Sequence, residues 1–271
     1  MAETKQTSPR DGGITNWSAL TSISFGGTQM IIIAVLAAVV LLVWQLVFTW
    51  REVPTYVMPR PSEIGIALVN IAPTIWPHIL TTLRELLTGY LVGASIGIVL
   101  AALVTQFPFV EKIITPYILI LITTPMVALV PLLMLKLGFG LAPRYIAVGL
   151  AVGPMVMINS STGFRRTDAA KLALAKVYGA TTLQSFIKIR FPLALPMIIV
   201  GLMVGGIFGL LTAVGAEMVG GSTGLGNRLM YYSGLARMDS FFAVLVLVAT
   251  IGISLYVFFY WVGKKWASWE E

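Results

Sequence analysis

The sequence predicts an all-α membrane protein with six transmembrane helices. Of its 271 residues, 58% are hydrophobic and only 11% are charged, whereas a soluble domain carries about 25% charged residues. A helix needs about 20 apolar residues to cross a bilayer. Six segments without Asp, Glu, Lys or Arg meet this length: Met30–Trp50, Leu86–Val110, Ile113–Leu135, Tyr145–Phe164, Phe191–Ala216 and Ser240–Gly263.

These segments divide the chain into a polar tail, a separate first helix and a core. The expected parts are a cytoplasmic tail at 1–29, the first span at 30–50, a periplasmic loop at 51–78, a core with five spans at 79–263 and a cytoplasmic tail at 264–271. Within the proline-rich loop we expect a short helix over Ser62–Ile71, because Ser62 can cap it and Glu63 suits its first turn. Arg84 and Glu85 are expected to reach the membrane interface.

The distribution of basic residues orients the chain. The segment between the fourth and fifth spans contains one acid, Asp168, beside a dense basic group: Arg165, Arg166, Lys171, Lys176, Lys188 and Arg190. The positive-inside rule places such a segment in the cytoplasm. Both termini are then cytoplasmic, and the net charge of +7 does not indicate binding to nucleic acid.

The same cytoplasmic segment, 167–191, predicts two short helices joined by a glycine turn. Thr167 and Asp168 can cap the first helix, and Gly179 stands where a helix ends in a left-handed residue. Thr181 and Thr182 can start the second helix, which Pro192 should stop or kink. From the residues alone, this hairpin is either an amphipathic element on the lipid surface or a docking element for a cytoplasmic protein.

Two short sequences in this segment carry a family pattern. Ala173-Leu174-Ala175-Lys176-Val177-Tyr178-Gly179, followed by Ile189-Arg190-Phe191-Pro192, resembles the EAA motif of permease subunits of ABC importers. Gly179, Ile189, Pro192 and Ala175 fall on motif positions. Ala173 stands where the family usually has Glu, and Leu174 and Phe191 also depart from the pattern.

Other segments resemble the nitrate, sulfonate and taurine branch of that family, in the right order over roughly residues 54–263. They are Met58-Pro59-Arg60-Pro61-Ser62-Glu63-Ile64, Thr124-Pro125-Met126-Val127-Ala128-Leu129-Val130-Pro131-Leu132, Gly138-Phe139-Gly140, Gly215-Ala216-Glu217-Met218 and Gly224-Leu225-Gly226. The resemblance implies the type I importer permease fold in a bacterial inner membrane.

The resemblance also implies partners and a mechanism. The helix pair would be a coupling element, with Ala173, Ala175, Lys176, Gly179, Ile189 and Pro192 at the contact with a cytoplasmic ATPase dimer. A periplasmic binding protein would deliver the solute, and two permease copies would form the pathway, with a heterodimer of related permeases as the alternative. The branch moves nitrate, sulfonates, taurine, pyrimidine precursors and other small organic solutes.

Candidate pathway residues lie in two places. Thr123, Thr124, Pro125 and Met126 interrupt the aliphatic third span, where a proline frees a backbone carbonyl; the alternative is a simple kink. Glu217, at the end of the fifth span, is a candidate gate or dimer contact by its depth, or else a structural hydrogen-bonding residue. Gly89, Gly93 and Gly97 form a helix-packing face.

Several other functions are not supported. The glycine-rich segment Gly220–Gly226 lacks the Gly-Lys-Ser/Thr ending of a phosphate loop, so we expect no ATP site, metal or cofactor on this chain; ATP and magnesium would be bound by the partner. With no cysteine and His78 as the single histidine, an enzyme site is not indicated, and His78 is expected at the interface. A stand-alone secondary transporter or channel remains the alternative, but it should pair charges within the membrane, and the six segments hold none.

Overall fold

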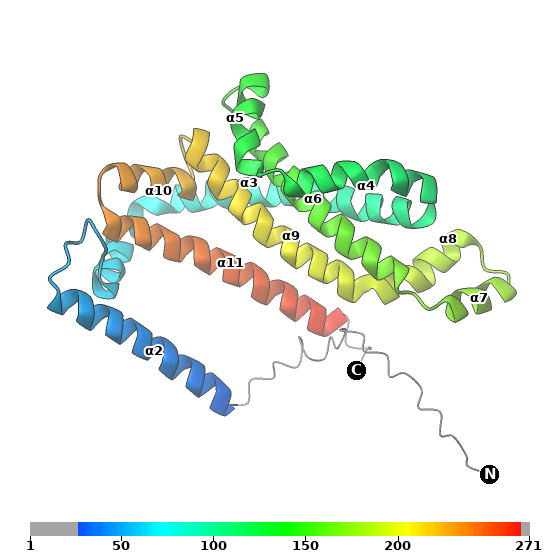
Figure 1. Cartoon of the computed structure of the whole chain (residues 1–271), viewed down its shortest axis with the longest axis horizontal. Coiled ribbons are helices and arrows are strands. Elements are labelled where there is room, and N and C mark those ends of the chain that lie inside the picture. Colours follow the sequence, from blue (N-terminus) through cyan, green and yellow to red (C-terminus); the bar gives the residue numbers. More distant parts are fainter. Residues whose placement is uncertain (1–26, 267–271) are drawn as a thin grey trace, which may run out of the picture.

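The computed structural model describes residues 27–266, which are helical over most of their length, with no strand within that range. The helices are α2 (Gly27–Trp50), α3 (Pro61–Gln106), α4 (Pro108–Thr123), α5 (Met126–Leu137), α6 (Ala142–Arg165), α7 (Ala169–Val177), α8 (Thr182–Ser185), a π-helical turn (Phe186–Arg190), α9 (Phe191–Gly220), α10 (Leu225–Gly234) and α11 (Met238–Trp266) (Figure 1). Residues 1–26 and 267–271 of the two expected tails lie outside the described residues.

The prediction of a six-span helical protein is confirmed, with one span broken. Five helices are long and apolar enough to cross a membrane, and α4 with α5 makes a sixth, bent by 101° between Thr123 and Met126. Pro125 stands at this break and has no N–H to continue the helix. The third span is therefore two helices rather than one.

The core of the bundle is built on α6, which packs against α3 on one side and α9 on the other. Small residues allow both contacts. A Cβ added to Gly93 of α3 would lie 2.5 Å from the carbonyl oxygen of Gly149, and one added to Gly201 of α9 would lie 2.9 Å from the Cβ of Asn159. The expected packing face of Gly89, Gly93 and Gly97 is thus an intramolecular contact with α6.

The helix expected over Ser62–Ile71 is only the beginning of α3, which continues through Pro73 and Pro77 to Gln106. Glu63, in the first turn, accepts the N–H of Arg60 at 2.8 Å, while Ser62 does not cap. Ile64, Ala67, Ile71 and Ile75 are buried in the core cluster at helical spacing. This packing holds the segment helical despite the two prolines, which sit one turn apart and leave the packed face unbroken.

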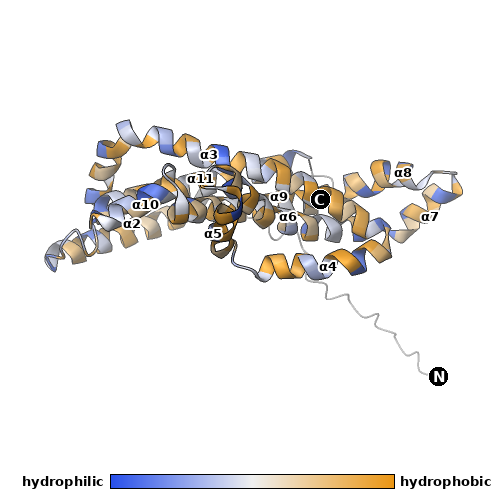
Figure 2. Ribbon diagram, turned by 90° about the horizontal axis from the view of Figure 1, so that it is seen from above, coloured by the Kyte–Doolittle hydropathy of each residue, from blue (hydrophilic) through white to orange (hydrophobic). Residues whose placement is uncertain are grey.

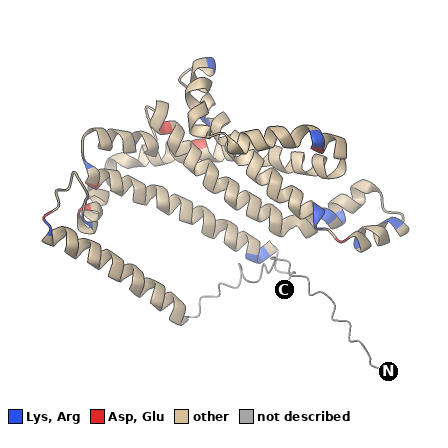
Figure 3. Cartoon of the chain, in the orientation of Figure 1, with Lys and Arg blue, Asp and Glu red and all other residues tan. Residues whose placement is uncertain are grey.

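The remaining elements lie at the two ends and the edge of the bundle. The pair α7–α8 projects from one end, and α10 lies at the other (Figure 1). Helix α2 is at the edge, with none of its most apolar window buried. Basic residues gather near α7–α8 and at the C-terminal end of α11 (Figure 3). The two ends of the molecule therefore differ in charge.

Candidate functional site

The first half of the predicted coupling element is a short helix, α7, with a capping interaction at each end. The Asp168 carboxylate accepts the N–H of Ala170 at 2.8 Å at the start of α7. At its end, the N–H of Ala180 donates to the Ala175 carbonyl and that of Gly179 to the Lys176 carbonyl, both at 3.0 Å. This is a Schellman motif, and Gly179 has the expected positive φ, +78°. The glycine sets the direction in which the chain leaves α7.

The second half begins at Thr181 and is fastened to the core. The Thr181 hydroxyl accepts the N–H of Gln184, whose side chain accepts the N–H of Thr181. Phe186 follows and packs its ring against Phe164 of α6, with centroids 4.9 Å apart. Phe164 is 1% exposed. The element is thus anchored at one end and free at the other.

Pro192 was expected to stop or kink the second helix, and the structure shows that it does not stop it. Instead the chain stays helical from Thr182 to Gly220, with a π-helical turn at Phe186–Arg190 directly before the proline. A π turn widens the helix locally, which gives room for a ring that would clash with the preceding turn of an α-helix. The second half of the predicted coupling element is therefore continuous with the fifth span.

The residues predicted to contact an ATPase lie on an open surface. Ala173, Lys176 and Gly179 are exposed, and Ala175, Ile189 and Pro192 are half-buried. Large apolar side chains accompany them and are 57–83% exposed: Leu174, Val177, Tyr178, Leu183 and Ile187. Hydrophobic and hydrophilic residues alternate along the pair (Figure 2). Such a patch rimmed by polar residues is typical of a protein or membrane contact.

A second candidate site is a pocket of about 300 Å³ at the break between α4 and α5. The predicted residues Thr123, Thr124, Pro125 and Met126 all line it. Its other walls are Leu121 and Ile122 of α4, Leu150, Ala151, Pro154 and Met155 of α6, and Phe208 and Thr212 of α9. The structure brings four of the five predicted pathway residues together, and Glu217 is not among the lining residues.

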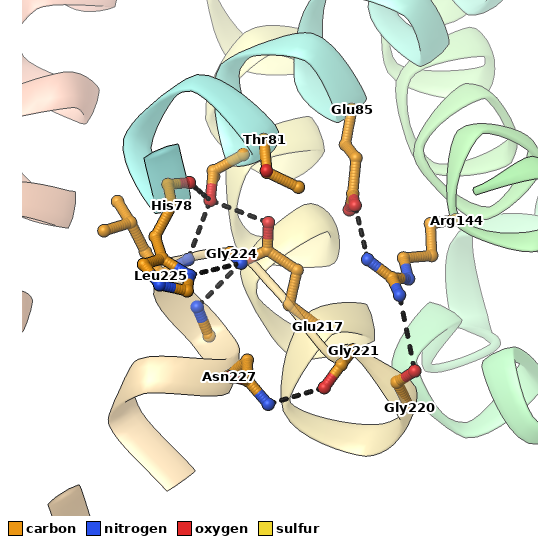
Figure 4. A network of polar contacts seen from close by, with 12 residues as sticks. His78, Thr81, Glu85, Arg144, Glu217, Gly220, Gly221, Gly224, Leu225 and Asn227 are labelled. Atoms are coloured by element: carbon orange, nitrogen blue, oxygen red, sulfur yellow. Dashed lines mark hydrogen bonds and ion pairs between the residues drawn. The ribbon is translucent and has the colours of Figure 1, made fainter. Parts of the chain in front are cut away.

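Glu217 is instead the centre of a buried polar network (Figure 4). It is 0% exposed. Its carboxylate accepts the hydroxyl of Thr82 and the N–H of Gly226, each at 2.7 Å. The Thr82 oxygen in turn accepts the N–H of Leu225 at 2.9 Å. The network joins α3 and α9 to the start of α10.

His78, which was expected as an interfacial residue, belongs to the same network. It is 8% exposed and faces two donors, the N–H of Gly224 at 3.1 Å and the Nε–H of Arg228 at 2.8 Å. A neutral imidazole has one acceptor nitrogen, so His78 accepts from one of them at a time. The long helix α3 carries it into the protein, where a loop was expected.

Glu85 also differs from expectation. It does not reach the interface but forms a buried ion pair with Arg144 of α6; their side chains are 0% and 3% exposed. Arg144 donates a further hydrogen bond to the Gly220 carbonyl at 3.3 Å (Figure 4). The charge-free segments themselves hold no ion pair, but α3 and α6 both begin before those segments, and the pair lies in these earlier parts of the two helices. Arg84, the neighbour of Glu85, is exposed on the surface of the protein.

The structure thus combines several membrane-length helices, one of them broken, with a buried polar network and a projecting helix pair. Residues 93–268 match the family of inner membrane components of binding-protein-dependent transport systems. A probable ABC transporter permease protein of Haemophilus influenzae is 31% identical over 83% of this chain and 92% of that protein. The chain belongs to this family of permeases.

Two further comparisons concern the branch and the fold. A putative aliphatic sulfonates transport permease protein of Bacillus subtilis is 27% identical over 80% of this chain and 79% of that protein. A chain of the MetNI methionine ABC transporter, solved in inward-facing conformations, has a TM-score of 0.58 at 17% identity, and the match covers 72% of this chain and 95% of that one. The fold is that of type I importer permeases.

Proposed function

We propose that this chain forms the membrane pathway of an ATP-driven importer and couples it, through α7 and α8, to separate ATPase subunits that bind ATP and magnesium. The observation that carries the proposal is the helix–glycine–helix element, which stands outside the bundle with large apolar side chains exposed. Its anchor at Phe164 and its continuity with α9 allow a movement of the element to reach the fifth span.

The proposed orientation puts α7 and α8 in the cytoplasm of a bacterial inner membrane. Basic residues concentrate at that end, in agreement with the positive-inside rule. The Gly27 end of α2 and the Trp266 end of α11 point away from the α10 end (Figure 1), as they would if both termini were cytoplasmic. Helix α10 would then face the periplasm, where a binding protein delivers the solute.

The pathway would form between two copies of the chain. The pocket at the α4–α5 break is not fully enclosed by one copy, and α2, α4 and α5 leave large apolar side chains exposed for lipid or a second copy. We propose a homodimer and a small solute of the nitrate, sulfonate, taurine and pyrimidine-precursor class. Support comes from the quoted motifs and from the relative whose name specifies aliphatic sulfonates.

Co-purification with the cognate ATPase tests the coupling proposal. Leu183 of α8 is 68% exposed, and Leu183→Ser should lower recovery of the ATPase with the permease, because an apolar contact is lost. Leu235, 53% exposed just beyond α10 at the other end, is the matched control, and Leu235→Ser should leave ATPase recovery unchanged. Equal recovery with both variants, or ATP hydrolysis by the pure single chain, would contradict the proposal.

A further inference from the structure

The pocket at the α4–α5 break has a chemistry that restricts the solute. None of its twelve lining residues is acidic, basic or histidine. Arg144, which precedes the lining residues of α6, is already paired with Glu85. A charged solute in such a pocket would lose its hydration without gaining a counter-charge. The walls therefore disfavour ions.

The hydroxyl groups of the broken span present oxygen rather than hydrogen to the pocket. Thr123 donates its hydroxyl proton to the carbonyls of Leu119 and Ile120, at 3.0 and 3.1 Å, and Thr124 donates to Ile120 at 2.7 Å. Each threonine has a single hydroxyl hydrogen, so what remains toward the pocket is acceptor capacity. Both side chains line it.

The backbone at the break adds to this acceptor surface. Pro125 has no N–H, so the carbonyl of Leu121, one turn before it, lacks its helical donor. Leu121 also lines the pocket. Carbonyl and hydroxyl oxygens repel the oxygens of a nitrate or sulfonate group, which can only accept hydrogen bonds. The same oxygens attract N–H and O–H groups.

Thr212 of α9 closes the pocket from the other side and was not among the residues that the sequence indicated. Its side chain is 5% exposed and lines the pocket, and its hydroxyl makes no hydrogen bond within residues 27–266. The oxygen is not one of the fully enclosed polar atoms without a partner in that range, so it is open to the pocket. A hydroxyl open to a pocket can donate a hydrogen bond to a solute or accept one from it. Phe208, one turn earlier, offers an aromatic face for an apolar ring.

We propose that this pocket is a solute-contact site for an uncharged organic molecule with N–H or O–H donors, held by Thr212 and the oxygens of the α4–α5 break. The inference rests on the proposed import function but replaces its broad solute class by small uncharged organic molecules. It departs from the aliphatic sulfonates named for the Bacillus subtilis relative, because nitrate and simple sulfonates would be disfavoured in this pocket.

The natural absence of cysteine allows a direct test in the whole permease–ATPase complex. Thr212→Cys would be treated with either of two methanethiosulfonates of similar size, one ending in a hydroxyethyl group and the other in a sulfonatoethyl group. Ser62→Cys, at an exposed position outside the pocket, gives the rate ratio of the two reagents in open water. At Thr212→Cys the hydroxyethyl reagent should be favoured by a further factor of at least about ten, because burial of the sulfonate is unfavourable.

The same rate ratio at both positions, or no reaction of Thr212→Cys with either reagent, would overturn the inference. Neither result bears on coupling, which is read separately from the ATPase that co-purifies with the labelled protein. Loss of the ATPase with a preserved rate ratio would contradict the proposed function and leave the character of the pocket standing.

Discussion

The hydroxyl of Thr82 lies 2.7 Å from the carboxylate of Glu217, although the two residues are 135 positions apart in the chain. The Thr82 hydroxyl also accepts a hydrogen bond from the N–H of Leu225, and the Glu217 carboxylate accepts one from the N–H of Gly226. Two side chains therefore fix the first turn of α10 against α3 and α9. The glycine-rich segment between α9 and α10 is held from both of its ends.

Glu217→Gln should loosen this attachment. A carboxylate accepts both hydrogen bonds, whereas the amide has a single acceptor oxygen and places N–H groups opposite a donor. We expect a loss of about 1–3 kcal/mol in the free energy of unfolding and faster amide hydrogen exchange at 221–226. The exposed Glu52 provides the control Glu52→Gln. Unchanged exchange at 221–226 would contradict the role assigned to Glu217.

The Glu85–Arg144 pair should behave as a coupled unit. Arg144→Met leaves a buried carboxylate without its partner, and removal of one member of a buried pair typically costs about 3–5 kcal/mol. Adding Glu85→Gln should recover part of that loss. Thermal unfolding of the two single variants and the double variant in detergent measures the coupling. Strictly additive effects would mean that the two side chains do not interact.

Gly93→Ala should destabilise the bundle because the added methyl would meet the Gly149 carbonyl at 2.5 Å. Overpacking of this kind costs about 1–3 kcal/mol. Gly65 lies in the same helix with nothing within 4 Å of its Cβ position, so Gly65→Ala is the matched control. The comparison is made on yield and on melting temperature. Equal behaviour of the two variants would show that α3 and α6 are less closely packed than described.

Gly179→Val should affect coupling more than folding. The φ of +78° costs a residue with a Cβ about 1 kcal/mol, and a branched one more. No atom lies within 4 Å of the added Cβ, so the effect is on the backbone angle between α7 and α8. Expression should stay near normal while ATPase recovery and transport fall sharply. Gly65→Val is the control. Full ATPase recovery with Gly179→Val would show that the backbone angle at Gly179 is not needed for binding of the ATPase.

The architecture could be predicted from the sequence because apolar length and basic clustering act over whole segments. The polar network could not. Glu85 and Arg144 each stand one residue outside a charge-free segment, Leu86–Val110 or Tyr145–Phe164. A rule that ends a membrane helix at the first charged residue therefore leaves out the Glu85–Arg144 pair. The two charges neutralise each other only when α3 and α6 pack together.

Pro73 and Pro77 led to the prediction of a loop, because proline usually marks one, whereas α3 continues through both residues. The buried positions Ile64, Ala67, Ile71 and Ile75 were the signal of the longer helix, visible as a three- and four-residue period. Thr212 had no local signal at all, because an unpaired hydroxyl is a property of the assembled pocket. By contrast, Asp168, Gly179 and Thr181 were found from the sequence because capping is a local interaction.

The two glycine-lined contacts of α6 have a mechanical consequence. The helix backbones approach each other closely at these contacts, with few side-chain atoms between them, because there is no space for a Cβ on Gly93 or on Gly201. Helices α3, α6 and α9 should therefore tilt as one rigid body instead of sliding past one another. A displacement of α7–α8 would then be transmitted to the opposite end of the bundle as a rotation of these three helices. The deformation would be absorbed at Thr124–Pro125, where the chain already bends.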